Sequence, residues 1–349
     1  MKKIGILTFH RVNNYGAILQ AYALKFILQN KLNHNVKIIN YVSPHMVYYS
    51  KRYNFIPKKI KLLLQVLVNL KSFKRLKYYL SVEFFKFRFL IDTPKIKIEK
   101  INKLSKQYDV FITGSDQVFN PHLTDFDKNF FLDFVKDKNK CFSYAASFGL
   151  NYENLTDKEK MFIKQNLNNF SSLSLREKQG EDIVNNLSSI KTNVHIDPTL
   201  LLSYDEWLPI SKNIKEEKFV LIYLMDTNNK IMEYAKMLAL NKNLKIKIIK
   251  KVSPQEWLGY FMKAKYIITN SFHGLAFSIN FNKNFFVDFI PTNQRNSRLE
   301  NLLDLTNLRN RLIDNIGTDY DKPIDWDSVN KIVEIEREKS ISYLKEITK

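Results

Sequence analysis

Cysteine is almost absent from this sequence, since Cys141 is the only one among 349 residues. A single thiol excludes an intramolecular disulfide and a cysteine-rich zinc site, and we expect it to be buried. No run of about 18 uncharged apolar residues occurs, so we expect no membrane-spanning helix. The apolar run at the N-terminus is too short for the core of a signal peptide. Together these observations favour a cytoplasmic protein.

Several signatures of nucleotide and metal binding are also missing. The sequence has neither the lysine-containing phosphate loop of nucleotide-hydrolysing enzymes nor the G-x-G-x-x-G of dinucleotide-binding domains. Its six histidines form no pair at metal-ligand spacing. We therefore expect no metal and no organic cofactor.

Acidic residues are few compared with basic ones, and the formal net charge is +20. Residues 51–100 hold fourteen Lys or Arg and three acidic residues, a local net charge of +11. Within this stretch, residues 55–91 combine a helical pattern with many Leu, Phe, Tyr, Lys and Arg residues, which predicts an inserted helical pair. Such a pattern suits peripheral contact with an anionic membrane. Alternatively, its apolar side chains pack on the protein while the lysines face water. We find no recognition-helix or RNA-stacking motif, so we expect no nucleic-acid partner.

The rest of the chain alternates strand-like and helix-like stretches, which predicts parallel α/β sheets. We expect two doubly wound, Rossmann-like domains, at 1–205 and 206–325, with a basic helical insertion at about 50–100. A final helix in 326–349 can pack back on the first domain. The expected strands are 4–9, 36–41, 108–113, 141–147, 173–175, 193–196, 219–224, 244–249, 266–269 and 284–288. The expected helices are 18–31, 156–170, 179–187, 230–240, 254–264, 298–305 and 328–347, and Thr156 with Glu159 forms a capping-box pattern.

Polar residues collect where the predicted strands end. In open parallel sheets this edge binds ligands, and helices that begin there point backbone N–H groups at anions. Each residue also has a structural alternative: Asp116 and Asp197 as helix caps, Arg176 in a surface ion pair with Glu177, and His273 as a core histidine. The groups are Asn13-Asn14-Tyr15-Gly16, Gly114-Ser115-Asp116-Gln117, Arg176, Asp197 and Asn270-Ser271-Phe272-His273-Gly274.

Seven blocks of sequence, taken in order, resemble the polysaccharide pyruvyl transferase family. They extend from residue 4 to about residue 313, and the basic insertion falls outside them. Each block alone is a weak signal, whereas their order and spacing together are specific. The blocks are GILTFHRVNNYGAILQAYAL, DVFITGSDQVFNP, SYAASFG, SLREKQG, DPTLLL, YIITNSFHGLAFSI and NSRLENLLDLTNLRNRLI.

The resemblance implies a fold like that of the GT-B glycosyltransferases, with the active site in the cleft between the domains. It implies phosphoenolpyruvate as donor, a sugar diol as acceptor, and a pyruvate ketal on a surface polysaccharide or its lipid-linked precursor as product. By the family's motifs His273 is the acid that protonates the donor, and Arg176 binds the donor. Asp116 is our candidate to accept a proton from the acceptor hydroxyl. A lipid-linked acceptor would place the protein at the inner face of the cytoplasmic membrane.

The remaining candidate site residues are assigned by their place in these motifs. Asn270, Ser271 and Gly274 are assigned to donor binding, and Asn13, Asn14, Tyr15, Gly16 and Gln117 to acceptor binding. Many family members carry an arginine two residues before the histidine, and here that position is Ser271. Arg298 or Arg295 is expected to replace it.

Two other functions are compatible with this sequence. A glycosyltransferase using a nucleotide sugar would have the same fold, and it predicts stabilisation by nucleotides but not by phosphoenolpyruvate. A non-catalytic glycan- or membrane-binding relative is suggested by the missing arginine, and it predicts that replacing His273 leaves function intact.

Overall fold

The computed structural model describes residues 1–45, 70–216, 218–226, 229–290 and 296–349. Two compact units are present: unit 1 comprises Met1–Pro198 and Ile341–Lys349, and unit 2 comprises Thr199–Ser340. The boundary predicted near residue 205 therefore lies a few residues beyond the point where unit 1 gives way to unit 2. No helix in the described part of the chain has the length and hydropathy needed to cross a bilayer.

Unit 1 is built on parallel strands in the order β2-β1-β3-β4. A further parallel pair, β5 and β6, continues beyond β4 through the isolated bridges Phe142–Ser172 and Ala146–Leu175. The strands are β1 (Lys3–Leu7), β2 (Asn35–Ile38), β3 (Val110–Thr113), β4 (Cys141–Ser143), β5 (Leu173–Leu175) and β6 (Thr192–Val194).

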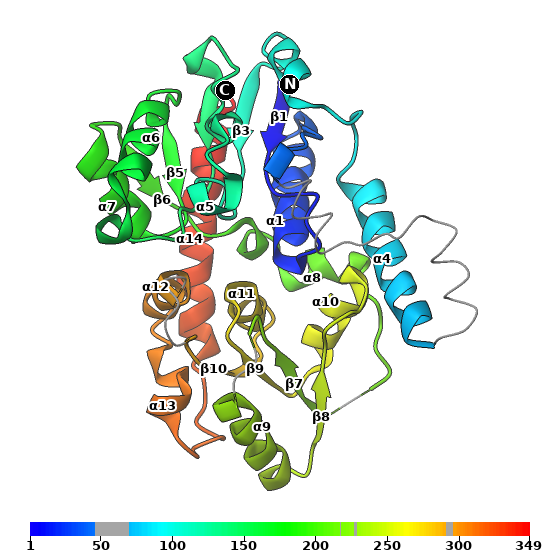
Figure 1. Cartoon of the computed structure of the whole chain (residues 1–349). Helices are drawn as coiled ribbons and strands as arrows, with labels where there is room; N and C mark the ends of the chain where they lie inside the picture. Colours follow the sequence, from blue (N-terminus) through cyan, green and yellow to red (C-terminus); the bar gives the residue numbers. More distant parts are fainter. Residues whose placement is uncertain (46–69, 217, 227–228, 291–295) are drawn as a thin grey trace. The chain divides into compact units, whose positions relative to one another are not determined.

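The α-helices of unit 1 connect these strands, and Figure 1 shows α4 beside α1. Short 3₁₀ segments lie at Ile98–Leu104, Lys128–Phe131, Lys138–Lys140 and Tyr152–Asn154. The α-helices are α1 (Tyr15–Phe26), α4 (Leu70–Phe89), α5 (Pro121–Thr124), α6 (Asp157–Leu167) and α7 (Lys178–Leu187).

Unit 2 has one parallel sheet in the order β10-β9-β7-β8. Its strands are β7 (Phe219–Tyr223), β8 (Lys245–Ile248), β9 (Tyr266–Thr269) and β10 (Asn284–Val287). Its helices are α8 (Tyr204–Trp207), α9 (Asn229–Asn241), α10 (Pro254–Lys263), α11 (Phe272–Asn280), α12 (Ser297–Leu305) and α13 (Ile313–Ile316). The last helix, α14 (Trp326–Ile347), begins in unit 2 and ends in unit 1.

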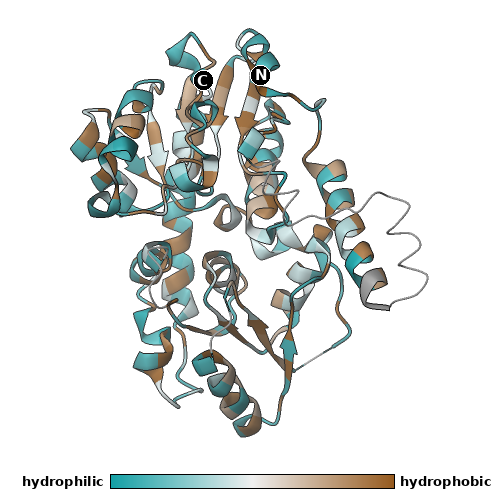
Figure 2. Ribbon diagram, in the orientation of Figure 1, coloured by the Kyte–Doolittle hydropathy of each residue, from teal (hydrophilic) through white to brown (hydrophobic). Residues whose placement is uncertain are grey.

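The central strands are apolar because both of their faces are covered. Every residue of β3, β7 and β9 is buried, as expected for strands with helices on both sides of a parallel sheet. The same strands carry the hydrophobic colours in Figure 2. Cys141 is buried, as expected, and burial raises the pKa of its thiol to about 12.

Local signals account for several helix ends. Thr156 accepts a hydrogen bond from Glu159 N, and the Glu159 side chain accepts one in return, which confirms the predicted capping box. The helix expected at 18–31 begins earlier, at Tyr15, because the Asn14 side chain caps it, and it ends in a π-helical turn at Ile27–Lys31. Tyr15 and Gly16 therefore lie in a helix rather than in the expected loop.

One expected strand is shorter in the structure, and one expected helical pair lies partly outside the described residues. The strand expected at 141–147 ends at Ser143, and Ala145, with φ of +44°, breaks the extended conformation. Of the helical pair expected at 55–91, residues 55–69 lie outside the described part of the chain. The second half of the prediction is confirmed by α4.

Each sheet reverses its strand order at one point. In unit 1 the chain moves outward from β1 to β2 and then returns to the other side of β1 with β3; in unit 2 it does the same with β7, β8 and β9. The loops that follow β1 and β3, and those that follow β7 and β9, therefore diverge at these switch points. Open α/β sheets bind ligands at this position.

Candidate functional site

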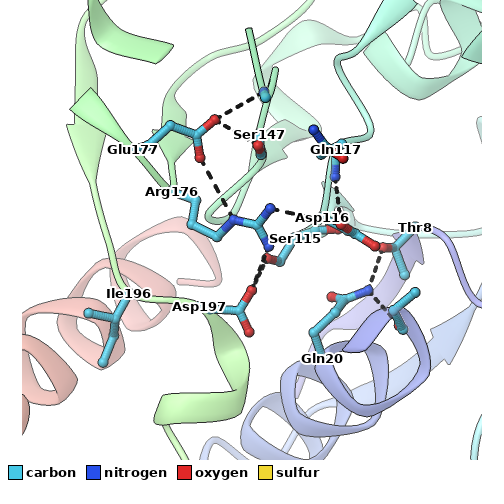
Figure 3. A network of polar contacts seen from close by, with 12 residues as sticks. Thr8, Gln20, Ser115, Asp116, Gln117, Ser147, Arg176, Glu177, Ile196 and Asp197 are labelled. Atoms are coloured by element: carbon cyan, nitrogen blue, oxygen red, sulfur yellow. Dashed lines mark hydrogen bonds and ion pairs between the residues drawn. The ribbon is translucent and has the colours of Figure 1, made fainter. Parts of the chain in front are cut away.

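The switch point of unit 1 carries a buried network of charged residues (Figure 3). Arg176, directly after β5, donates a hydrogen bond from Nη1 to Oδ2 of Asp197 over 2.9 Å. Ser115, after β3, donates to the same oxygen over 2.8 Å. The loop after β1 joins this network because Thr8 donates to the Ser115 carbonyl and accepts from Gln20 of α1.

Three carboxylates surround Arg176. Besides Asp197, its guanidinium lies 3.8 Å from Oδ1 of Asp116 and 3.7 Å from Oε2 of Glu177. Burial works against the charge of Arg176, but the carboxylates of Asp197, Glu177 and Asp116 together hold its pKa above the ordinary value. Arg176 is buried and Glu177 is buried beside it, so the alternative of a surface ion pair is wrong.

Asp116 is the most accessible of the three carboxylates around Arg176. Its side chain is 15% exposed, while those of Asp197 and Glu177 are almost completely buried. It has a φ of +80°, a conformation unusual for any residue except glycine, and its Oδ1 accepts a hydrogen bond from Gln117 N. The backbone therefore turns sharply at Asp116, shortly after the end of β3.

Gln117 is packed against a glycine with positive φ. A Cβ on Gly149 would lie 1.6 Å from Nε2 of Gln117, so no other residue fits there unless Gln117 moves. Gln117 is itself buried. The structure thus places Gln117 at the same switch point as Asp116, with its amide turned toward Gly149.

The candidate acceptor residues lie where β1 leads into α1. Asn14 caps α1 by accepting from Ala17 N, and Tyr15 and Gly16 form its first turn. The preceding loop is held by α4, because Lys86 donates to the carbonyl of Arg11 over 2.9 Å and to Oδ1 of Asn13 over 2.7 Å. This contact with α4 was not expected from the sequence.

His10, in the same loop, is buried and its pKa is lowered to about 4 by burial. Its ring nitrogens lie 3.0 Å from the carbonyl oxygen of Thr8 and 3.2 Å from Oδ1 of Asn40. The ring is therefore neutral near pH 7 and connects two strand ends.

The switch point of unit 2 is formed by the junction of β9 and α11. Asn270 ties this junction to the loop after β7, because it accepts from Met225 N over 2.8 Å and donates to the Asp226 carbonyl over 3.0 Å. Ser271 caps α11 by accepting from Gly274 N. Gly274 has no room for a side chain, since a Cβ would lie 2.2 Å from Oγ1 of Thr269.

His273 stands in the first turn of α11. Its ring is almost buried and meets the ring of Phe272 edge-to-face at a centroid distance of 5.1 Å. Arg298, in the first turn of α12, places its guanidinium carbon 5.8 Å from the centre of the Phe272 ring. The structure therefore brings Arg298 to the Ser271-Phe272-His273 turn. Arg295 lies outside the described residues.

The structure groups the sequence-predicted residues into two sets. Asp116, Gln117, Arg176 and the Asn13–Gly16 group belong to unit 1, and Asn270, Ser271, His273, Gly274 and Arg298 belong to unit 2. Sequence reasoning missed the burial of Glu177 and its hydrogen bond from Ser147, and it left Asp197 open as a helix cap. The sequence signals for Asp197 were its strand-end position and its place at the start of the block DPTLLL. No group of three His, Cys, Asp or Glu among the described residues is arranged to hold a metal ion.

Comparison with known proteins gives a family and a fold. The family model for polysaccharide pyruvyl transferase matches residues 14–287. No curated protein matches the sequence. Among solved structures, UDP-GlcNAc 2-epimerase from Neisseria meningitidis bound to UDP-GlcNAc is 11% identical, with a TM-score of 0.50 over 100% of this chain and 99% of that one.

A protein of Listeria monocytogenes assigned to the UDP-N-acetylglucosamine 2-epimerases is equally similar. It is 11% identical, with a TM-score of 0.50 over 95% of this chain and 90% of that one. At this identity the likeness shows the fold alone. The prediction of two Rossmann-like α/β domains of the GT-B type is confirmed.

Proposed function

The chain belongs to the polysaccharide pyruvyl transferase family, and we propose that it transfers the pyruvyl group of phosphoenolpyruvate to two hydroxyls of one sugar. The acceptor is a surface polysaccharide or its lipid-linked precursor, and the products are a pyruvate ketal and phosphate. The observation that carries this proposal is His273 in the first turn of α11, at the switch point of a parallel sheet and beside the turn that Arg298 contacts.

The proposed reaction needs one acid and one base. His273 gives a proton to the methylene carbon of phosphoenolpyruvate, which leaves a cationic centre at carbon 2. One sugar hydroxyl adds there, the bond from carbon 2 to the phosphate oxygen breaks, and a second hydroxyl closes the ring. Of the two hydroxyl protons, one restores the histidine, and the other is taken up by Asp116 as the base before it leaves with phosphate. Histidine suits the acid role because its ordinary pKa is near 6.5. No metal or organic cofactor enters this scheme.

Two features of unit 2 support an anionic donor. The first turn of α11 presents backbone N–H groups at its N-terminus, where carboxylates and phosphates are favoured. We assign to Arg298 the role that the family gives to the arginine two residues before the histidine. The turn itself is fixed by Asn270, Ser271 and the close packing of Gly274.

In unit 1 the proposed roles follow from accessibility and charge. Asp116 is the carboxylate beside Arg176 that solvent reaches, so we assign it to the acceptor hydroxyl. Arg176 remains our candidate for donor binding. Its buried ion pairs also hold the side chain of Asp116 in position. Asn13, Asn14, Tyr15, Gly16 and Gln117 remain the proposed acceptor residues. We propose a cytoplasmic protein that meets its acceptor at the inner face of the membrane.

The reaction can be tested by supplying the purified protein with phosphoenolpyruvate and a glycolipid extract from its own membranes. We expect release of phosphate that needs the extract, and a glycolipid heavier by one pyruvic acid less one water. His273→Ala should lower the rate by about 100-fold or more, the usual contribution of a general acid. His122→Ala is the control for loss of a histidine outside the candidate site; His122 is exposed in α5 and lies 2.9 Å from Glu159 of α6.

The other outcomes separate the competing functions. Undiminished release by His273→Ala would remove that residue from the mechanism. No release, together with thermal stabilisation by a nucleotide sugar, would indicate a glycosyltransferase. No release and no stabilisation by either donor would indicate a non-catalytic relative.

A further inference from the structure

Helix α4 has two faces of different character. One face is packed: Tyr78, Val82, Phe85 and Lys86 are buried. Phe85 and Phe89 lie against Tyr22 of α1, and Lys25 of α1 donates to the Phe89 carbonyl over 3.0 Å. The helix is therefore held against the rest of unit 1 from Tyr78 to Phe89.

The opposite face of α4 carries large apolar side chains that solvent reaches. Phe73, Leu80, Phe84 and Phe87 are 53%, 61%, 58% and 74% exposed. Their spacings of seven, four and three residues place all four on one stripe of the helix. A soluble monomer rarely exposes such a contiguous group, and a group of this kind usually marks a binding surface.

Exposed positive charge borders one side of this stripe, at Lys74, Lys77 and Arg88. Arg75 is also exposed, near the start of the helix. The one acidic residue of α4 is Glu83, and it is paired with Lys86 over 2.9 Å. A helix face with an exposed apolar stripe and a basic border complements an anionic bilayer, where rings enter the acyl boundary and cations meet lipid phosphates.

We propose that the outer face of α4, formed by Phe73, Leu80, Phe84 and Phe87 with their basic neighbours, docks on an anionic lipid bilayer. This goes beyond the proposed reaction, and the docking does not depend on it. The sequence predicted membrane contact somewhere in residues 55–91, and this proposal assigns that contact to one face of α4.

The inner face of the same helix connects docking with the candidate acceptor loop. Lys86 donates to Arg11 O and to Asn13 Oδ1, and Tyr78 donates to the Asn13 carbonyl over 3.4 Å. When the outer face of α4 is bound to a bilayer, these contacts therefore also fix the position of the loop after β1 relative to the bilayer surface. If the proposed acceptor is lipid-linked, this geometry presents that loop to it.

Vesicle binding tests the docking directly and requires no catalysis. Wild-type protein is sedimented with vesicles of phosphatidylcholine alone or with about one third phosphatidylglycerol. We expect binding to the anionic vesicles that falls with added salt. The variant Phe73→Ser/Leu80→Ser/Phe84→Ser/Phe87→Ser should bind at least about ten-fold more weakly. Met237→Ser/Leu240→Ser is the control, because these side chains are 53% and 82% exposed on α9 of unit 2.

Equal binding by the α4 variant and the control, or binding without preference for anionic lipid, would overturn the proposal. The proposal would also be overturned if the wild-type protein were a dimer that does not bind vesicles and the α4 variant were a monomer. The stripe would then be an interface between two copies of the protein. Circular dichroism of each variant shows whether it is folded, and a misfolded quadruple variant is replaced by the single changes.

A single label tests what covers the stripe. Cys141 is buried, so Phe84→Cys introduces one reactive thiol. We expect a maleimide dye sensitive to polarity to react there quickly and to shift to the blue on addition of anionic vesicles. Failure of the dye to react would show that another part of the chain covers the face. Reaction without a shift would show that the face stays in water. Either result would overturn the proposal.

Discussion

Arg176 and His10 show two ways in which unit 1 buries a group that can carry charge. Arg176 stays charged because Asp197, Asp116 and Glu177 surround it. His10 has hydrogen-bond partners but no carboxylate, and burial holds its pKa at about 4. Removing one partner of a buried ion pair is costly, whereas a buried neutral ring makes stability depend on pH.

We predict that His10→Gln removes part of the acid sensitivity of unit 1. In the unfolded chain His10 binds a proton below about pH 6.5, but in the folded protein only below about pH 4. Stability is therefore lost as the pH falls through this window, by about 2 kcal/mol between pH 7 and pH 5.

Urea unfolding of wild type and variant, followed by circular dichroism at both pH values, checks this prediction. The difference in free energy of unfolding between the wild type and His10→Gln should be about 2 kcal/mol smaller at pH 5 than at pH 7. An advantage that stays constant with pH would show that His10 does not titrate in this window.

At the scale of elements, the junction of β9 and α11 depends on a close approach between strand and helix. Thr269 donates to the Tyr223 carbonyl and accepts from Ser271 N, and its side chain occupies the space that a Cβ on Gly274 would need. This contact fixes the first turn of α11, and with it His273, relative to the sheet.

We predict that Gly274→Ala pushes α11 away from β9. The change should cost about 1–3 kcal/mol of stability, as overpacking of a core does, and phosphate release should fall. Gly180→Ala in α7 is the matched control, because the nearest atom would lie 3.4 Å from its Cβ. That change should be neutral or slightly stabilising.

The double variant Gly274→Ala/Thr269→Ala identifies the cause. Relief of the clash should make the double variant less destabilised than the sum of the two single changes. Simple additivity of the two changes would mean that the strain lies elsewhere.

Sequence patterns predicted the features that depend on neighbouring residues. The strand–turn–helix at His273 and the capping box at Thr156 follow from local spacing, and the structure has both. Features that depend on distant residues were missed. The burial of Glu177 beside Arg176 and the contact of Lys86 with the loop after β1 need segments far apart in sequence. The positive φ of Asp116 is set by its surroundings, because an aspartate has no local preference strong enough to predict it.

At the scale of the molecule, α14 belongs to both units. Its last residues lie in unit 1, where Leu344 is fully buried and Tyr343 donates to the Ser143 carbonyl over 3.0 Å. All three tryptophans, Trp207, Trp257 and Trp326, lie in unit 2. Tryptophan fluorescence therefore reports on unit 2, while hydrogen exchange in β4 reports on unit 1.

We predict that Leu344→Ala destabilises unit 1 by about 2–5 kcal/mol, the usual cost of a large-to-small change in a core. Hydrogen exchange in β4 should accelerate, while the tryptophan-detected unfolding of unit 2 changes little. Ile335→Ala is the control on the same helix, because Ile335 is exposed. Equal acceleration by both changes would show that the effect comes from helix propensity rather than from the core of unit 1.

The division of α14 also has a consequence for biosynthesis. Domains are usually completed in the order in which they leave the ribosome. Here residues 341–349 are made after the whole of unit 2, so the unit that starts first receives its last piece later than its neighbour. Unit 2 is one continuous segment and can fold as soon as it emerges. Until those residues arrive, the first unit lacks Leu344, and we expect the apolar surface that Leu344 covers to be open to water during synthesis.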